Sequence, residues 1–124
     1  MAQALKYPQL VLRIGIAIVF LWFGIDKFIH PQHWLDAWVP AWVQSAVEAI
    51  HLGPQNFVIL TGMFETFVGL SLATGFFMRL FSAAGALFLA VVIVINGVPL
   101  DLARDIGLIG GLVALSLWPE RTYV

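Results

Sequence analysis

Four long stretches of the chain are almost free of charged side chains, and this feature limits the folds that are open to it. They cover roughly residues 7–29, 55–77, 80–98 and 102–118. A helix that crosses a bilayer needs about 20 mostly apolar residues. Strands of a membrane barrel would instead alternate apolar and polar residues, and these stretches do not. The sequence therefore predicts an all-α fold, an integral membrane bundle of four transmembrane helices that forms one domain over residues 1–124.

The overall composition agrees with a lipid environment. Hydrophobic residues make up 61% of the 124 residues and charged residues only 10%, whereas a soluble domain carries about 25% charged residues. The net charge of −1 leaves no basic surface for nucleic acid. The chain has no cysteine, which excludes disulfides, thiolate nucleophiles and iron–sulfur clusters within it. Any electrons in its chemistry must come from a bound cofactor, a partner subunit or a substrate.

The segment between the first two long stretches, residues 32–52, has a different character. Trp34, Trp38 and Trp42 recur every four residues, and Pro40 interrupts the pattern. Tryptophan favours the membrane–water interface, where its ring is in apolar surroundings and its N–H group is hydrated. We expect this Trp-rich helical segment to lie in the interface. A helical lid that packs on the bundle and closes one end of a pocket is an equally good interpretation.

The positions of lysine and arginine predict the orientation. Four spans place both termini on one side, together with Lys6, Arg13, Arg79 and Arg121; Lys27 and Arg104 belong to the other side. Cytoplasmic segments are enriched in these residues. The count favours a multi-pass protein of the inner (cytoplasmic) membrane with both termini in the cytoplasm.

Helical spacing shows which residues share a face. In the first helix, steps of three and four residues connect Arg13, Ala17, Phe20, Gly24 and Lys27. We expect this face to pack inside the bundle, because small residues let a second helix approach closely. Lys27 should then point inward, whereas Asp26 lies about 100° round the helix and can pair elsewhere.

The second helix carries the deepest ionisable group. Gly62, Glu65, Gly69 and Ala73 share a face, and Glu65 lies about half way along the span. A carboxyl at this depth cannot reach the headgroups, and burial favours its neutral form unless a cation lies near. We interpret Glu65 as part of a pocket or proton relay, with a hydrogen bond that only supports packing as the alternative.

The fourth helix is short for a span. Arg104, Gly107, Gly111, Ala114 and Trp118 share a face that contains a GxxxG pattern. After Asp105 only about thirteen residues remain before Pro119, too few to cross a bilayer at a rise of about 1.5 Å each. Arg104 and Asp105 must therefore enter the bilayer or be shielded by residues 32–52.

Several polar residues should gather at the end of the bundle opposite the termini. They are Asp26, Lys27, Asn96, Asp101, Arg104 and Asp105. The hypothesis is an ion network in which Lys27 pairs with Asp105 above a deeper Glu65. The alternative for Asp26 and Lys27 is a pair that anchors the helix end at the interface, and for Arg13 and Arg79 an ordinary cytoplasmic anchor.

The three histidines give a weak metal signal. His30 and His33 form an HxxH pattern across Pro31, and His51 lies at the far end of the same segment. None lies well inside an expected span, so a haem between two helices is not expected. We expect structural roles for these histidines and no metal site.

Three motifs in order resemble the DoxX family of small four-helix membrane proteins. They are "LRIGIAIVFLWFGIDKF", "GMFETFVGLSLATGFFMR" and "ARDIGLIGGLVALSL". The resemblance covers most of the chain and marks Arg13, Lys27, Glu65, Arg79 and Asp105 as the positions of interest. The Trp-rich segment departs from the family pattern. Some relatives are similar to the membrane subunit of thiosulfate:quinone oxidoreductase, and others are linked to membrane redox or stress-detoxification systems.

Three functions remain open at this point. The first is a membrane subunit of a quinone-linked oxidoreductase or redox-stress system, in which Glu65 donates protons to a quinone and a redox partner subunit supplies electrons. Aromatic residues near the expected pocket are Trp22, Phe23, Phe64, Phe67 and Phe88. The second is a proton-coupled small-molecule transporter or channel with Glu65 as its gate. The third is an assembly or scaffold subunit without chemistry. A homo-oligomer is compatible with each.

Overall fold

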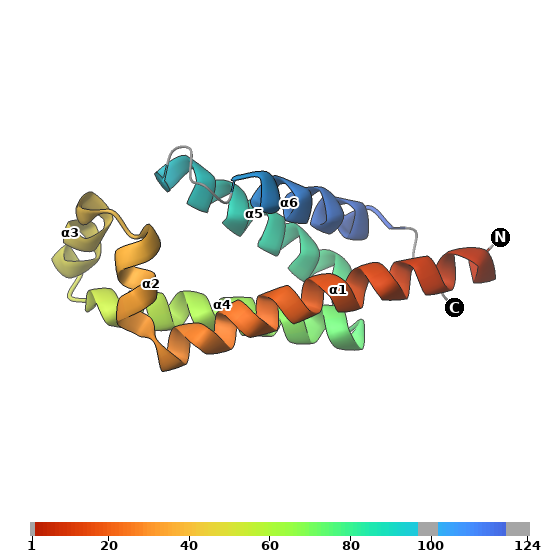
Figure 1. Cartoon of the computed structure of the whole chain (residues 1–124), viewed down its shortest axis with the longest axis horizontal. Coiled ribbons are helices and arrows are strands. Elements are labelled where there is room, and N and C mark those ends of the chain that lie inside the picture. The colour runs from red at the N-terminus through yellow and green to blue at the C-terminus, as the bar shows by residue number, and fades with distance from the viewer. Residues whose placement is uncertain (1, 97–101, 119–124) are drawn as a thin grey trace.

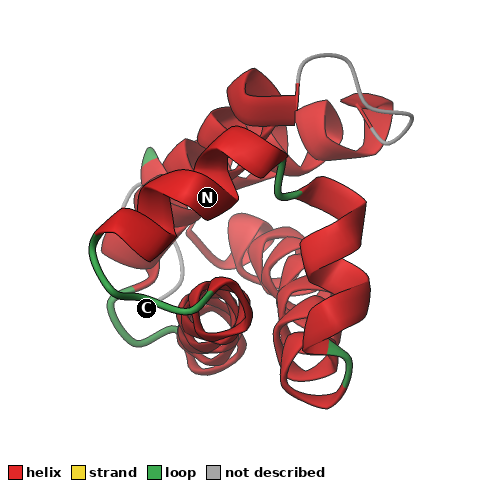
Figure 2. Cartoon of the chain, turned by 90° about the vertical axis from the view of Figure 1, so that its left-hand side faces the viewer, coloured by secondary structure: helices red, strands yellow, loops and turns green. Residues whose placement is uncertain are grey.

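The computed structural model describes residues 2–96 and 102–118, and every element in these ranges is a helix (Figure 2). The helices are α1 (Ala2–Ile29), α2 (Pro31–Trp38), α3 (Ala41–Ala49), α4 (Pro54–Thr74), α5 (Met78–Asn96) and α6 (Leu102–Ser116). The four long stretches correspond to α1, α4, α5 and α6, whose bounds differ from the expected ones by a few residues. The Trp-rich segment forms α2 and α3.

The four longer helices form two antiparallel hairpins. α1 lies along α4, and α5 lies along α6 (Figure 1). α2 and α3 sit at one end of the molecule, which we call the cap end (Figure 1). The opposite end, where α1 begins and α6 ends, we call the terminal end. This up-and-down order agrees with the arrangement expected from the sequence.

Glycine brings α1 and α4 close together. A Cβ atom built at Gly62 would lie 2.9 Å from the carbonyl oxygen of Gly24, and one at Gly24 would lie 2.6 Å from Oγ1 of Thr66. Farther along α4, a Cβ at Gly69 would lie 2.7 Å from Cγ of Leu21. A side chain at Gly24 or Gly62 would force the two helix backbones apart, and one at Gly69 would displace Leu21. The inward faces expected for the first two helices are confirmed, since Ala17, Gly24, Lys27, Gly62, Glu65 and Gly69 are all buried.

The two hairpins meet in a hydrophobic core toward the terminal end. Its buried residues include Phe20 of α1, Val68 and Leu72 of α4, and Leu112 and Leu115 of α6. Nearer the cap end the hairpins diverge in Figure 1, and α4 and α5 are separated there by the pocket described below.

The glycines of the GxxxG pattern in α6 differ in their surroundings. A Cβ atom at Gly107 would have no neighbour within 4 Å, although one at Gly111 would lie 2.8 Å from Cδ1 of Ile16. Among the α6 residues from Asp105 onward, Asp105, Leu112 and Leu115 are buried. Leu112 and Leu115 pack this helix against the core, and of the two glycines in the GxxxG pattern only Gly111 lies at a close contact.

α2 and α3 cover the cap end of α4 with a second apolar cluster. Leu35, Val39 and Val43 are buried together with Val58 of α4, and Ile95 of α5 packs against them. Val39 and Pro40 separate the two short helices, which confirms the interruption expected at Pro40. The packing supports a lid, while a position in the membrane interface stays a prediction.

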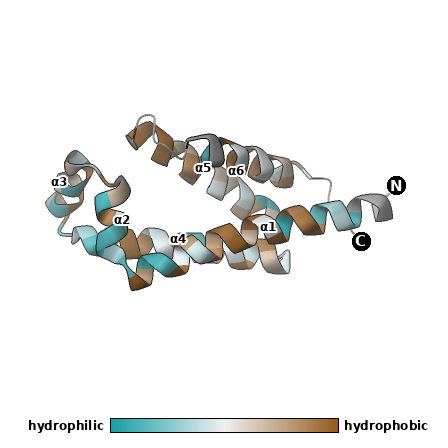
Figure 3. Ribbon diagram, in the orientation of Figure 1, coloured by the Kyte–Doolittle hydropathy of each residue, from teal (hydrophilic) through white to brown (hydrophobic). Residues whose placement is uncertain are grey.

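Three helices are long and apolar enough to cross a membrane. They comprise Lys6–Ile29, Pro54–Thr74 and Met78–Ile95. Residues Asp105–Ser116 form a shorter apolar helix. Figure 3 shows apolar residues along the long helices and several polar residues at the cap end. The structure thus supports three of the four expected spans, and α6 as the fourth remains a proposal.

Candidate functional site

Lys27 and Glu65 form an ion pair inside the molecule. The Nζ atom of Lys27 lies 3.0 Å from Oε1 and 2.9 Å from Oε2 of Glu65, so the ammonium donates to both carboxylate oxygens. Their side chains are 3% and 7% exposed. Buried charges of this kind persist only when they are paired and hydrogen-bonded. The pair joins α1 to α4 near the cap end.

The glycine contact between the helices makes this pair possible. A Cβ atom at Gly62 would lie 2.9 Å from Cβ and 3.7 Å from Cδ of Lys27. The stem of Lys27 therefore crosses α4 over Gly62 and carries its ammonium toward Glu65, which lies one turn farther along that helix. The inward direction expected for Lys27 is confirmed, and Lys27 forms an ion pair with Glu65. Its expected pairing with Asp105 stays a prediction.

Trp34 of α2 covers the ammonium on the cap side. Nζ of Lys27 lies 4.0 Å from the centre of the indole ring, a cation–π geometry. The ring is also in an edge contact with Phe23, with centroids 5.3 Å apart. Its N–H group donates to Oδ2 of Asp26 at 2.7 Å. Sequence reasoning missed this role, although Trp34 follows Lys27 by seven residues across the turn at Pro31.

Asp26 joins this arrangement to the surface. Its Oδ1 lies 3.0 Å from Nδ1 of His30, and the two side chains are 30% and 61% exposed. Asp26 thus pairs away from Lys27, as expected from its place on the helix. His30 has a structural partner, and the described residues contain no group of three or more His, Cys, Asp or Glu arranged to hold a metal ion.

Asp105, in the first turn of α6, is 5% exposed. Its charge acts unfavourably on that of Glu65, so the second hairpin places an acidic group near the ion pair. The side chains of Asn96 and Arg104 and the whole of Asp101 lie outside the described residues. Their expected part in a network at this end stays a prediction.

The two arginines marked by the family resemblance cap helix ends elsewhere. Nε of Arg13 donates to the carbonyl oxygen of Leu72 at 2.9 Å, at the end of α4, and Nη1 donates to Oε1 of the buried Gln9 at 3.1 Å. Nε of Arg79 donates to the carbonyl oxygen of Ser116 at 3.1 Å, at the end of α6. A cation at a helix C-terminus is favourable. Both contacts lie toward the terminal end, away from the Lys27–Glu65 pair.

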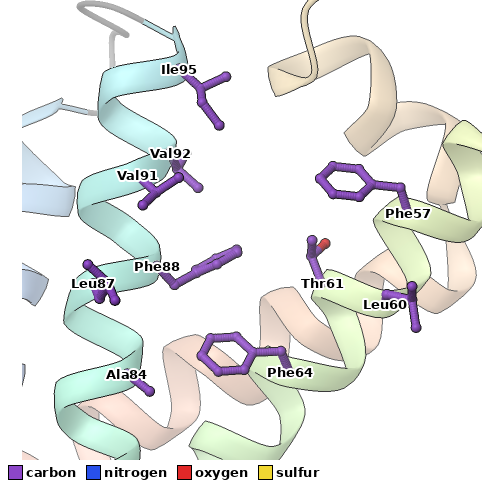
Figure 4. A pocket seen from close by; sticks show the side chains of 10 residues that line it. All are labelled: Phe57, Leu60, Thr61, Phe64, Ala84, Leu87, Phe88, Val91, Val92 and Ile95. Atoms are coloured by element: carbon purple, nitrogen blue, oxygen red, sulfur yellow. The ribbon is translucent and has the colours of Figure 1, made fainter. Parts of the chain in front are cut away.

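An apolar pocket of about 540 Å³ lies between α4 and α5 near the cap end. We call it the slot. In Figure 4, Phe57, Thr61 and Phe64 of α4 face Phe88, Val92 and Ile95 of α5 across it. The remaining lining residues are Leu60, Ala84, Leu87 and Val91. The volume falls in the range of small-molecule sites.

The slot and the ion pair use the same part of α4. Glu65 follows Phe64 directly and lies one helical turn after Thr61, and both of these residues line the slot. Phe64 and Phe88 contact each other, with ring centroids 5.2 Å apart. Two other aromatic residues expected near a pocket, Trp22 and Phe67, are instead exposed on the outer surface.

A model of the DoxX family matches residues 9–97. The matched range includes Arg13, Lys27, Glu65 and Arg79 and ends before Asp105, so the resemblance proposed for the last helix lies outside it. A search of curated proteins gives no match, and neither does a search of solved structures.

Proposed function

The chain belongs to the DoxX family of membrane proteins, and we propose that it is a membrane subunit of a quinone-linked oxidoreductase or redox-stress system. One observation carries this proposal. Glu65 of the buried Lys27–Glu65 pair lies on the stretch of α4 that forms one wall of an apolar slot. This slot is large enough for a substituted aromatic ring.

The slot fits the body of a quinone. Its walls are apolar and include three phenylalanines, Phe57, Phe64 and Phe88. Aromatic side chains stack well on a flat ring. Leu60, Leu87 and Val91 at the rim also belong to the apolar surface, with exposed side chains. A hydrophobic molecule dissolved in the bilayer can therefore enter from the side without crossing water.

The ion pair supplies a proton donor. Reduction of a quinone to a quinol takes up two electrons and two protons. In this proposal a redox partner subunit supplies the electrons. Glu65 holds and relays protons, and the ammonium of Lys27, bonded to both of its oxygens, keeps the carboxylate charge compensated between transfers.

The same proposal includes the membrane topology. α6 serves as the fourth span, and the terminal end faces the cytoplasm, where the exposed Lys6 and Arg79 fit the excess of positive residues on that side. α2 and α3 then lie at the outer surface of the inner membrane.

Quinone retention tests the proposal directly. Protein purified from native membranes should release a quinone when its lipids are extracted and analysed by mass spectrometry. Val92→Trp should remove this quinone by filling the slot, whereas Val94→Trp adds the same volume at a side chain that is 80% exposed and should retain it.

Chemistry is tested with Glu65→Gln. This variant should bind a short-chain benzoquinone but slow quinone reduction in membranes by at least tenfold. Protein that carries no quinone, in membranes whose quinone reduction is indifferent to Glu65→Gln, contradicts the proposal.

The diverging hairpins favour a second candidate, proton-coupled movement of a small molecule. The hairpins share a core toward the terminal end and are separated by the slot near the cap end. Solute flux in proteoliposomes that follows an imposed pH gradient would support this candidate, and flux unaffected by Glu65→Gln would exclude it.

A further inference from the structure

The two ends of the bundle differ in what surrounds the buried ion pair. Toward the terminal end, the hairpins share a hydrophobic core with side chains such as Phe20, Val68 and Leu112. Toward the cap end, the neighbours of Lys27 are the indole of Trp34 and, beyond it, the carboxylate of Asp26.

Exposure increases outward along these polar groups. The side chains of Glu65 and Lys27 are 7% and 3% exposed, that of Asp26 is 30% exposed, and that of His30 is 61% exposed. Asp26 and His30 are in contact with each other, and so are Lys27 and Glu65. Trp34 stands between these two pairs.

The indole of Trp34 blocks proton transfer along these polar groups. Its N–H group can donate a hydrogen bond but has no lone pair that accepts one, so it cannot pass a proton from Asp26 to Lys27. The bond to Asp26 at 2.7 Å and the contact with Lys27 at 4.0 Å hold the ring between them. In this position Trp34 separates the buried pair from water at the cap end.

We propose that Trp34 is a gate, latched by Asp26, and that water and protons reach the Lys27–Glu65 pair from the cap end when it opens. Opening breaks the indole–Asp26 hydrogen bond and moves the ring off the ammonium. A proton then passes from water through the Asp26–His30 pair to the carboxylate of Glu65. The net charge of the Lys27–Glu65 pair rises by one.

The ionisable groups around the gate come from each element packed against it. They are Asp26 and Lys27 of α1, His30 between α1 and α2, His33 of α2 and Glu65 of α4. Asp105 of α6 adds a charge that acts on Glu65. The proposal concerns access to the pair and does not depend on a quinone. It therefore stands or fails independently of the proposed function.

The lysine content of the chain provides a clean test. Lys6 and Lys27 are its only two lysines, and Lys6 is exposed in α1 near the terminal end. Purified protein in detergent is treated with a water-soluble amine-reactive ester, and labelling of each lysine is followed over time by peptide mass spectrometry. In the unmodified protein Lys27 should react at least tenfold more slowly than Lys6.

Removal of the gate should expose Lys27. Trp34→Ala should raise the labelling rate of Lys27 at least tenfold and leave that of Lys6 unchanged. Trp34→Phe keeps a ring over the ammonium but loses the bond to Asp26, so a smaller increase is expected. Trp42→Ala is the matched control, because Trp42 is 63% exposed on the outside of α3, and it should change neither rate.

Sealed vesicles test the side of access. A membrane-impermeant ester should label Lys27 of Trp34→Ala only from the side on which Lys6 is protected. Should Trp34→Ala fail to fold, Asp26→Leu removes the latch and leaves the ring, and an increased rate at Lys27 is expected there too. Fast labelling of Lys27 in the unmodified protein, an unchanged rate in the folded gate variants, or labelling of both lysines from one side would overturn the proposal.

Discussion

The Nζ atom of Lys27 lies within 3.0 Å of both carboxylate oxygens of Glu65, and this contact crosses from α1 to α4 inside the protein. Both side chains are buried, and the indole of Trp34 covers the ammonium. The two groups therefore compensate each other's charge.

This relationship predicts how stability responds to substitution. Lys27→Met and Glu65→Gln should each lower the free energy of unfolding by about 3–5 kcal/mol, because each breaks a buried, hydrogen-bonded ion pair. The double variant should be less destabilised than the sum of the two. Unfolding by heat or denaturant in detergent micelles measures all four proteins. Additive losses of ordinary surface size, below about 0.5 kcal/mol each, would show that Lys27 is only an interfacial anchor.

The stability of the protein should also depend on glycine where α1 contacts α4. Gly62→Ala places a methyl group 2.9 Å from both Cβ of Lys27 and the carbonyl oxygen of Gly24. The helices must separate, so we expect a loss of about 1–3 kcal/mol and faster labelling of Lys27 by amine reagents.

Gly15→Ala is the control for this effect. Position 15 also lies in α1 but has no atom within 4 Å of the added methyl group. Since alanine is the better helix former by about 1 kcal/mol, stability should stay the same or rise. A Gly62→Ala protein as stable as Gly15→Ala would contradict the close contact between the two helices.

Arg13 should stabilise the end of α4. Arg13→Leu removes a charged hydrogen bond to the carbonyl oxygen of Leu72 and one to Gln9, and bonds from charged groups contribute about 1.5–3 kcal/mol. Arg79→Leu also removes a helix cap, but its bond to Ser116 is exposed, so its loss should be below about 1 kcal/mol. Thermal unfolding compares the two, and equal losses would argue against a special role for Arg13.

Tryptophan depth tests whether α3 lies in the membrane interface. Trp22 and Trp42 are both exposed, but Trp22 lies within an apolar span and Trp42 lies in α3 at the cap end. In variants that keep one of the two and replace the other tryptophans by phenylalanine, lipids brominated near the headgroup should quench Trp42 more strongly. Lipids brominated deep in the acyl chain should quench Trp22. Absence of quenching at Trp42 would place α3 in water.

The inward faces of α1 and α4 could be predicted from the sequence because small and charged residues there recur with helical spacing. The pairing of Lys27 with Glu65 could not. Two short helices separate α1 from α4, so no tight turn fixes the register between them, and counting residues gives no measure of how far a lysine stem reaches. The GxxxG pattern of α6 could not show which of its residues pack, since Gly111 lies against Ile16 and Gly107 has no such neighbour, while Leu112 and Leu115 fill the core.

The role of Trp34 and the presence of the slot could not be predicted from the sequence, for a related reason. Trp34, Trp38 and Trp42 have the same spacing and composition around them, and only the turn at Pro31 decides that the first covers Lys27. The residues that line the slot are ordinary apolar residues of two spans. Their separation depends on the angle between the hairpins, which leaves no mark on the hydrophobic pattern.

The unequal lengths of the helices carry a consequence for the surrounding lipid. α1 has 28 residues and α6 has 15, which correspond to about 42 Å and about 22 Å at a rise of 1.5 Å per residue. A typical hydrocarbon layer is about 30 Å thick. With α6 in the bilayer, as proposed, lipids beside it must thin locally while those beside α1 need not. The protein should then prefer thin membranes and gather short-chain lipids on its α6 side.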